Sequence, residues 1–598
     1  MKKILTVLIV NILVLSSFGL IVLATNKTNN MRFKTEPVTF SKPIICDEGQ
    51  YLTVYLEEAT SFLGTPTQPK IPTVTKVFTF PFGTTIHTVT VNYSNTNELT
   101  ITKPLVLATE PLPVGTEETS DLIQDAAVYD SADIYPIQSY RYTTGAGLDG
   151  TDHVIYLAVH CYPLRYSPAT NMISFSRNAE IQITYEDPKT PTVFADDYDL
   201  VIISPFEFST QLQPLIAHKM SMGISTILKT TEEIYADYGG YDQAEQIKYF
   251  IKDAIETWGV DYVLLVGSVD KLPIRVSYAM MWEENLLTDL YYADIYDVNG
   301  SFCSWDIDGD GKFGEVYRDH HESYDIDGVD LYPDVNIGRL PCESTAEVTT
   351  VVNKIIHYET TTKGESWFNN IILIGGDTFP DSNGNEGEEQ NLLTEQIMSE
   401  FTPTKLWTSD GTFTTRTLNE AINNGAGFID YSGHGFEIGV ATHPPHSEEW
   451  IPYHTNHLLG AHNGDTLPII FFDACLTAKL DFNLSELFGY ASESLQTFID
   501  KYPGVASILF PTFAWCILKK TNGGAIATIG ATRTAFGSIE YGCGYLAVHF
   551  WQAYSSSETV SQMLTKAQND YITNIPNELI TIEEFILIGD PSLKMGGY

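Results

Sequence analysis

Short apolar runs alternate with amphipathic segments from about residue 195 onward, and this alternation constrains the fold more than any other feature. The runs "YDLVIISP" and "VDYVLLVGSVDKLP" are apolar enough for strands that are buried on both faces. Between them, residues 244–258 carry apolar side chains with helical spacing and are followed by Gly259. We therefore predict an α/β fold in which helices cover mostly parallel sheets.

A second round of the same pattern begins near Trp367. The run "FNNIILIGGDTFP" repeats the order of apolar strand, glycine, acid and proline found in "VDYVLLVGSVDKLP". Further strands are expected in "GAGFIDYSGHG", "LPIIFFDAC" and "GGAIATIGAT". This repeated pattern predicts two similar α/β units in tandem, over residues 195–365 and 366–598.

The preceding region, residues 25–190, has a different pattern of apolar and polar residues. Stretches such as "KVFTFPFGTTIHTVTVNYS" alternate apolar and polar residues with a period of two and are interrupted by Pro and Gly. This pattern predicts an all-β domain. The proline-containing stretch 186–194 is expected to link that domain to the α/β region.

The first 24 residues predict export from the cell. Lys2 and Lys3 precede an apolar run that ends at Ala24 with small residues, as in a secretory signal peptide. The run is long for a signal, so the alternative is an uncleaved membrane anchor. We expect a secreted protein, or one anchored by its N-terminus.

The charge and the cysteines exclude several classes of function. The 76 acidic and 33 basic residues give a formal net charge of −43, which disfavours binding to nucleic acid or anionic membranes. Such a surface suits metal cations and basic peptides, although solubility alone could explain it. The seven cysteines are scattered without CxxC spacing, which argues against a zinc site and a disulfide scaffold.

Two consecutive predicted strands are each followed by a residue whose side chain could take part in catalysis. "FIDYSGHG" presents His434 between two glycines, and "LPIIFFDACL" presents Cys475. Taken alone, each residue is most simply a structural histidine or a buried structural cysteine. Successive parallel strands are usually neighbours, however, and would bring both side chains to the same sheet edge. A thiol beside an imidazole is the arrangement that activates a cysteine nucleophile.

The pairing of "SGHG" with "DAC" resembles the caspase-like superfamily of cysteine peptidases, and more closely the gingipain family. The motifs that carry this resemblance occur in family order across about residues 200–598, and the β-rich region before them resembles the family's propeptide. They are "YADIYD", "YPDVNIGRLP", "NIILIGGD", "YSGHG", "DACL", "GGAIATIGAT" and "LIGDPSL".

The resemblance implies a cysteine endopeptidase made as a zymogen, with protein or peptide substrates. Cys475 would be the nucleophile and His434 the general base and acid, while the backbone N–H groups of Gly435 and Cys475 would face the oxyanion. Asp377 in "IGGD" would orient His434; the alternative is that it caps a turn or helix. The propeptide would act as an intramolecular inhibitor, with Arg177 and Lys189 as candidate processing sites.

Better-known members of the family cleave after Arg or Lys, and they use an acid shortly after the orienting one. Glu388 has the best spacing for this role here, and Glu386 is a second candidate. The alternative is a solvated acidic loop. About thirty residues near 480–512, which have helical character, are inserted relative to those members, and the histidine-rich stretch 443–462 is expected to form a substrate-binding rim.

The stretch "SWDIDGDGKFGEVY" predicts a structural calcium site. Carboxylates alternate around a glycine turn as in the first half of a calcium-binding loop, but Tyr317 occupies the twelfth position, where an EF-hand requires a bidentate Glu. The alternative is an Asx-rich turn. No organic cofactor is expected. The predicted calcium ligands are Asp306, Asp308, Asp310 and Glu315.

Two other functions are compatible with the sequence. One is a catalytically idle, calcium-dependent surface or binding protein on a peptidase scaffold, since fold alone does not guarantee turnover. The other is a peptidase whose only substrate is its own chain.

Overall fold

The computed structural model describes residues 31–598 except 65, 109–123, 132, 190–196, 280–284, 319–322, 381–383, 483–511 and 576–577. The predicted signal segment lies outside the described residues, as do most of the segment inserted near 480–512 and the end of the predicted linker.

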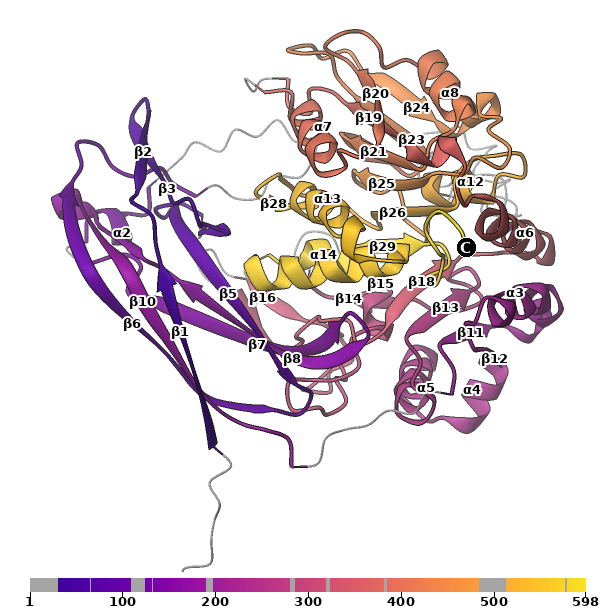
Figure 1. Ribbon diagram of the computed structural model, residues 1–598, viewed down its shortest axis with the longest axis horizontal. Coiled ribbons are helices and arrows are strands. Elements are labelled where there is room, and N and C mark those ends of the chain that lie inside the picture. The colour runs from indigo at the N-terminus through magenta and orange to yellow at the C-terminus, as the bar shows by residue number, and fades with distance from the viewer. Residues whose placement is uncertain are drawn as a thin grey trace, which may run out of the picture.

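Two antiparallel sheets form most of the N-terminal domain, which is drawn in indigo and purple in Figure 1. The first contains β1 (Met31–Thr39), β10 (Met172–Glu186), β6 (Thr85–Thr100) and β9 (Leu164–Ser167). The second has the order β4 (Ser61–Leu63), β5 (Ile71–Pro81), β8 (Asp152–Cys161) and β7 (Tyr140–Asp149). A hairpin of β2 (Ile44–Glu48) and β3 (Tyr51–Tyr55) and a short helix α2 (Ala126–Tyr129) complete the described part of this domain.

Alternation of side chains explains why these segments form strands. In β10, Ala179, Ile181 and Ile183 are buried, while Glu180 and Gln182 between them are exposed. The buried sides of the two sheets meet, as the rings of Phe80 on β5 and Tyr185 on β10 show with centroids 4.7 Å apart.

The α/β region is built on one continuous ten-stranded sheet. Parallel pairs join the first four strands to each other and the last five to each other. The strand order is β12 (Thr226–Thr230), β11 (Leu200–Ser204), β13 (Tyr262–Val266), β18 (Asn336–Leu340), β29 (Phe585–Ile588), β26 (Ala527–Ala531), β25 (Ile469–Asp473), β21 (Phe428–Ser432), β19 (Asn370–Gly375) and β20 (Thr402–Trp407).

The two rounds of strands therefore share a sheet instead of forming a separate sheet each. The C-terminal strand β29 lies at the seam, where it pairs in parallel with β18 of the first round and antiparallel with β26 of the second. This placement pairs a strand edge that each half would otherwise expose. It also means that the strands of the two halves run in opposite directions.

Helices cover both faces of this sheet (Figure 1). On one side α3 packs against α6 and α6 against α12; on the other, α13 packs against both α7 and α14. The α-helices among the described residues of the α/β region are α3 (Ser209–Ser221), α4 (Thr231–Asp237), α5 (Gln243–Trp258), α6 (Thr345–Thr361), α7 (Glu386–Ile397), α8 (Thr415–Asn424), α12 (Phe513–Lys519), α13 (Cys543–Gln552), α14 (Val560–Asn574) and α15 (Ile580–Glu584).

The helix predicted at 244–258 is confirmed as α5, which begins one residue earlier, and its ends have local causes. The side chain of Asp242 accepts a hydrogen bond from the backbone N–H of Glu245 at 2.9 Å, which caps the first turn. Gly259 ends the helix with a φ of 72°, a left-handed conformation that favours glycine.

Short strands outside the main sheet form small separate sheets. They are β14 (Arg275–Ser277) with β15 (Leu286–Thr288), β16 (Val316–Arg318) with β17 (Ser323–Asp325), β22 (His434–Phe436) with β23 (Gly439–Thr442) and β24 (Ile451–His454), and β27 (Gly537–Ser538) with β28 (Tyr541–Gly542).

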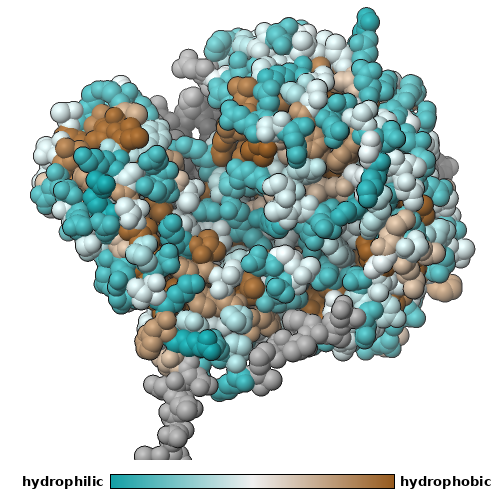
Figure 2. Space-filling model, viewed as in Figure 1, coloured by the Kyte–Doolittle hydropathy of each residue, from teal (hydrophilic) through white to brown (hydrophobic). Residues whose placement is uncertain are grey.

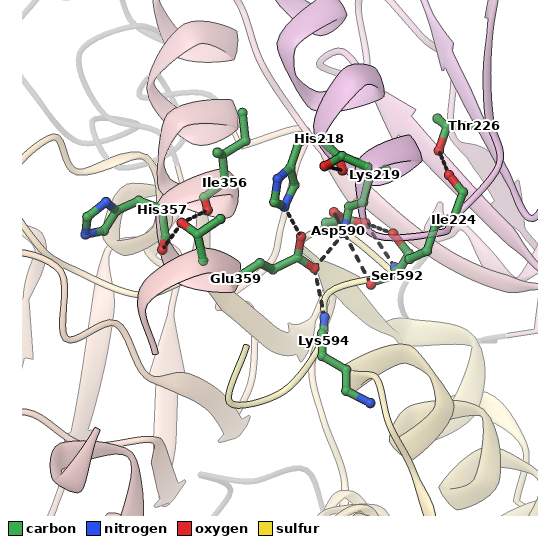
Figure 3. Close-up of polar contacts among 12 residues, drawn as sticks. His218, Lys219, Ile224, Thr226, Ile356, His357, Glu359, Asp590, Ser592 and Lys594 are labelled. Carbon is green, nitrogen blue, oxygen red and sulfur yellow. Dashed lines mark hydrogen bonds and ion pairs between the residues drawn. The ribbon is translucent and has the colours of Figure 1, made fainter. Parts of the chain in front are cut away.

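A buried cluster of charges ties the C-terminal segment to the first half of the sheet (Figure 3). Nζ of Lys219 on α3 lies 2.7 Å from Oε1 of Glu359 on α6 and 2.8 Å from Oδ2 of Asp590, which follows β29. The Glu359 carboxylate also contacts Nε2 of His218 at 2.8 Å and accepts a hydrogen bond from the backbone N–H of Lys594 at 2.9 Å. These contacts hold the pKa of Glu359 below its usual value despite its burial.

The N-terminal domain docks on the α/β region through Tyr332. The rings of Tyr332 and Tyr156 stack at 4.8 Å, and Leu148 donates a backbone hydrogen bond to the carbonyl of Pro333 at 2.8 Å. A Cβ at Gly145 or Gly147 would come within 2.3 Å or 2.7 Å of the Tyr332 side chain. The two glycines of β7 therefore permit this close approach.

Most of the surface visible in Figure 2 is hydrophilic, in keeping with the acidic composition. Apolar side chains gather at the end of the N-terminal domain, where β2 and β3 lie (Figures 1 and 2). Ile44, which is 57 % exposed, belongs to this hairpin. Within the described residues, none of the helices combines the length and the apolar character that crossing a membrane requires.

Candidate active site

The two strands predicted to carry His434 and Cys475 are neighbours. β21 and β25 pair in parallel, and their last residues, Ser432 and Asp473, stand side by side in the register. β19, which leads to Asp377, pairs with β21 on its other side. The loops that follow these three strands therefore leave the same edge of the sheet, as the sequence pattern predicts.

Gly435 brings the two loops into direct contact. A Cβ at this position would lie 2.1 Å from the carbonyl oxygen of Cys475 and 3.0 Å from its backbone nitrogen. Only a residue without a side chain can approach the Cys475 backbone in this way. The glycine after His434 thus places the histidine loop against the residue that carries the thiol.

His434 and Cys475 are both buried, with 4 % and 5 % of their surface exposed. Nε2 of His434 lies 2.9 Å from the carbonyl oxygen of Thr378, the residue after Asp377. Sγ of Cys475 lies 3.6 Å from the carbonyl oxygen of Ala535. The site is therefore assembled from β19, β21, β25 and the segment that follows β26.

The backbone turns sharply after Cys475. Leu476 has a φ of 58°, which is uncommon for a residue with a branched side chain. The turn is held by a hydrogen bond from the backbone N–H of Leu476 to the carbonyl of Arg533, at 2.9 Å. Strained backbone of this kind is typical of functional sites, where the surrounding structure enforces it.

Asp377 is buried beside the histidine loop. Its Oδ2 accepts a hydrogen bond from the backbone N–H of His446 at 2.7 Å, and its backbone pairs with that of His443. Burial raises the pKa of the Asp377 carboxyl. The acid that was expected to orient His434 thus fixes the 443–446 loop, while the carbonyl of Thr378 contacts the imidazole.

Aromatic residues surround His434 on the side of this loop. The imidazole centroid lies 5.5 Å from that of His443 and 4.8 Å from that of Trp450. Trp450 and Thr378 were not named from the sequence as parts of the site, whereas His443 was one of the histidines of the expected rim. The expected substrate-binding rim at 443–462 pointed to this segment, but only the folded chain shows which of its side chains reach His434.

The floor beneath the two loops is polar. The hydroxyl of Ser432 donates to Oδ2 of Asp473 at 2.8 Å, and the backbone N–H of Gly433 donates to the carbonyl of Asp473 at 3.2 Å. The thiol of Cys543, at the start of α13, also interacts with the Asp473 carboxyl. Burial raises the pKa of Asp473.

The two candidate specificity acids lie in the first turn of α7. Glu388 is buried and accepts hydrogen bonds from the backbone N–H of Ser409 at 2.9 Å and from its hydroxyl at 2.6 Å. Oε2 of Glu386 accepts from the backbone N–H of Thr378 at 3.1 Å. Both acids therefore have partners within the chain, and Glu386 supports the segment that contacts His434.

The predicted calcium ligands form two overlapping carboxylate groups. One brings together ligand atoms of Asp308, Asp310 and Glu315, and the other those of Asp306, Asp308 and Asp327, all within 4.8 Å of one another in each group. Asp327 was not predicted, because it lies outside the alternating motif. Lys312 competes for the first group, since its Nζ lies 3.0 Å from Oδ2 of Asp310.

Known protein families match both the N-terminal domain and the α/β region of the chain. The profile of peptidase family C25 matches residues 195–596, and that of the C25 propeptide matches residues 21–199. The chain belongs to peptidase family C25. The resemblance to gingipains drawn from the sequence motifs is thereby confirmed, together with the presence of a propeptide.

Individual relatives of this C25 family member are distant. Gingipain R2 of Porphyromonas gingivalis strain W83 is 24 % identical over 302 residues, which are 49 % of this chain and 34 % of the relative. The chain thus spans about a third of the length of that relative. An uncharacterised protein of Archaeoglobus fulgidus is 23 % identical over 328 residues, which are 52 % of this chain and 65 % of the relative.

Two solved structures match part of this chain, each with a TM-score below 0.5. The crystal structure of the Arg-specific cysteine proteinase gingipain R is 20 % identical, with a TM-score of 0.47, and the match covers 68 % of this chain and 80 % of the other. The complex of the pro- and mature domains of RgpB from Porphyromonas gingivalis is 19 % identical, also with a TM-score of 0.47, over 66 % of this chain and 79 % of the other.

Proposed function

We propose that this C25 family member is a cysteine endopeptidase in which Cys475 is the nucleophile and His434 the general base and acid. The observation that carries this proposal is the contact between Gly435 and the backbone of Cys475, which joins the two loops at one sheet edge. Adjacent thiol and imidazole groups can form the thiolate that acyl transfer requires.

We propose a separate role for each nitrogen of His434. With Nε2–H donating to the carbonyl of Thr378, Nδ1 is the nitrogen that can take the proton of the Cys475 thiol. The thiolate attacks the peptide carbonyl, and the N–H groups of Gly435 and Cys475 stabilise the oxyanion. His434 then protonates the leaving amine, and water hydrolyses the thioester to release the acid and restore the thiol.

Asp377 acts in this proposal as a positioning residue. Its carboxylate holds the backbone of His446, and its own backbone pairs with His443, so it fixes the strand end that offers the Thr378 carbonyl. We further infer that each half of the shared sheet corresponds to a caspase-like unit.

We infer that the N-terminal domain keeps the enzyme latent until the chain is cut near residue 190. Of the two candidate processing sites, Arg177 lies within β10 and its Nε donates to the carbonyl of Phe40 at 3.0 Å, which protects it inside a sheet. Lys189 lies beyond the end of β10 and is the better candidate. Sequencing the N-terminus of the mature form tests this assignment.

A preference for Arg or Lys at the cleaved residue is proposed from the resemblance and from the name of the Arg-specific relative. Glu386 and Glu388 would supply the negative charge. Their hydrogen bonds to Thr378 and Ser409 would then be shared with the substrate. Fluorogenic peptides that differ only in the cleaved residue test the proposal, and equal rates for Arg, Lys and Ala would remove it.

We also propose a structural calcium ion in the loop 306–315. The carboxylate set fits a hard cation, and Asp327, which is buried, adds a ligand from outside the loop. Burial raises the pKa of Asp327, and the neighbouring charges of Asp306 and Asp308 raise it further; a bound cation would stabilise the ionised carboxylates. Calorimetric titration of the protein with calcium, repeated with Asp308→Asn, tests the site.

Secretion, or anchoring through an uncleaved N-terminus, remains our proposal for the location of the protein. It depends on the signal-like composition of residues 1–24. Expression with and without this segment, followed by fractionation of cells and medium, tests it.

One experiment separates the peptidase from its two rivals. Purified protein is incubated with casein, with and without calcium, and labelled with an electrophilic peptide. Turnover and a label that Cys475→Ala abolishes are expected. A chain that takes no label would be the idle binding protein, and one that is labelled and processes only itself would be the self-limited peptidase.

A further inference from the structure

Trp450 is an exposed residue that lies beside the buried His434 of the candidate active site. Its surface is 47 % exposed, whereas His434 and Cys475 are almost completely covered. The indole centroid lies 4.8 Å from that of the His434 ring, and 5.9 Å from that of Phe436 in the same short strand. Trp450 therefore presents an apolar surface to solvent directly beside the proposed general base.

The chain holds Trp450 firmly in this place. The ring of His443 lies 3.9 Å from the indole, and its Nδ1 lies 3.1 Å from the carbonyl oxygen of Glu449. On the other side, Ile451 begins β24, which pairs with β23. A side chain fixed at both ends of its loop loses little conformational freedom when a ligand binds to it.

The proposed chemistry determines which part of a substrate meets this surface. His434 delivers a proton to the amine of the residue that follows the scissile bond, so the backbone of that residue must lie at the imidazole. A side chain attached there lies within reach of whatever covers His434. Among the described residues, Trp450 offers an exposed aromatic surface at that distance.

We propose that Trp450 determines specificity for the residue that follows the scissile bond, by packing its indole against a large apolar side chain. This inference rests on the proposed peptidase activity. Aromatic and aliphatic side chains gain most from an aromatic surface, because they bury the largest apolar area against it. Glycine at the same position gains nothing.

Internally quenched peptides that differ only in this residue test the inference. For the wild type, kcat/KM should be about tenfold higher with Phe or Leu than with Gly. Trp450→Ala should reduce this ratio to about twofold while leaving the rate with the Gly peptide within about threefold of wild type. Trp450→Phe should keep most of the preference. Phe206→Ala removes a 70 % exposed aromatic side chain after β11, in the half of the sheet that does not carry the proposed dyad, and should change neither value.

The outcomes separate this inference from the activity on which it rests. If the wild type cleaves none of the peptides in a Cys475-dependent reaction, the proposed function itself fails. If Trp450→Ala cleaves with an unchanged preference, the specificity role is wrong. An equal loss with every peptide, Gly included, would also contradict it, because Trp450 would then act only by positioning His434. Trp450→Leu replaces the alanine variant if the latter does not fold.

Discussion

The hydroxyl of Ser432 donates a 2.8 Å hydrogen bond to Oδ2 of Asp473, and this bond joins the last residues of the two strands that carry the proposed dyad. His434 follows two residues after Ser432, and Cys475 two residues after Asp473. This short polar bridge therefore helps to set the separation of His434 and Cys475, the proposed base and nucleophile, although neither of its members is expected to touch the substrate.

Breaking this bridge should slow catalysis without removing the thiol. Ser432→Ala and Asp473→Ala should each lower kcat/KM about tenfold to a hundredfold, because a small displacement of reacting groups has effects of that size. Asp473→Asn should stay within about threefold of wild type, since its amide oxygen can still accept the hydrogen bond. Steady-state kinetics on one peptide checks these values. An asparagine variant as slow as the alanine variant would mean that the carboxyl charge, not the bridge, matters.

A methyl group at position 435 should separate the two loops. In Gly435→Ala the new Cβ would meet the carbonyl oxygen of Cys475 at 2.1 Å, so one of the loops must move. We expect loss of measurable activity and of labelling at Cys475 by an electrophilic peptide. Gly239→Ala is the matched control, because no atom lies within 4 Å of its Cβ. Full labelling of the Gly435 variant would contradict the proposed contact.

The buried charge cluster should matter much more for stability than an exposed ion pair to the same segment. Glu359→Gln leaves the buried ammonium of Lys219 undercompensated and should lower the free energy of unfolding by about 3 to 5 kcal/mol. Glu558→Gln breaks an exposed pair with Lys594 and should cost at most about 1 kcal/mol. Denaturant unfolding of both variants measures the difference in the free energy of unfolding. Equal losses would show that the buried cluster stabilises the fold no more than the exposed ion pair does.

Docking of the N-terminal domain should weaken in mild acid through His153 on β8, whose ring centroid lies 6.1 Å from that of Tyr296 in the α/β region. Burial lowers the pKa of this residue to about 4, below the value of about 6.5 expected in the unfolded chain. The unfolded state therefore binds more protons between these values, and the stability contributed by neutral His153 is lost as the pH falls from 6.5 toward 4.

Comparison with a variant isolates this effect from the buried carboxyls nearby. The pKa values of Asp330 and Asp334 are raised by burial, so those groups act in the opposite direction. The stability of wild type relative to His153→Asn should therefore fall by up to about 3 kcal/mol between pH 7 and pH 4. Chemical denaturation at the two values measures it. A constant difference would show that His153 titrates normally in the folded protein.

Local patterns in the sequence were sufficient for most of the secondary structure near the site. The strands β21 and β25 lie where the buried apolar runs predicted them, and α5 ends before Gly259, as expected. The single shared sheet was not foreseen. Its seam depends on β29, which is separated by more than two hundred residues from its partner β18, and no local pattern encodes such a pairing.

In the candidate site too, some features follow from local sequence, and others from contacts between residues far apart in the chain. The sequence alone determined that a histidine loop and a cysteine loop end adjacent buried strands, because strand periodicity and glycine positions are local properties. Only the tertiary structure decided that the carbonyl of Thr378 contacts His434, that Asp377 holds the His446 backbone, and that Trp450 stands exposed beside the base. Those contacts join residues from different strands and loops, and their geometry exists only once the sheet has formed and the loops have packed against its edge.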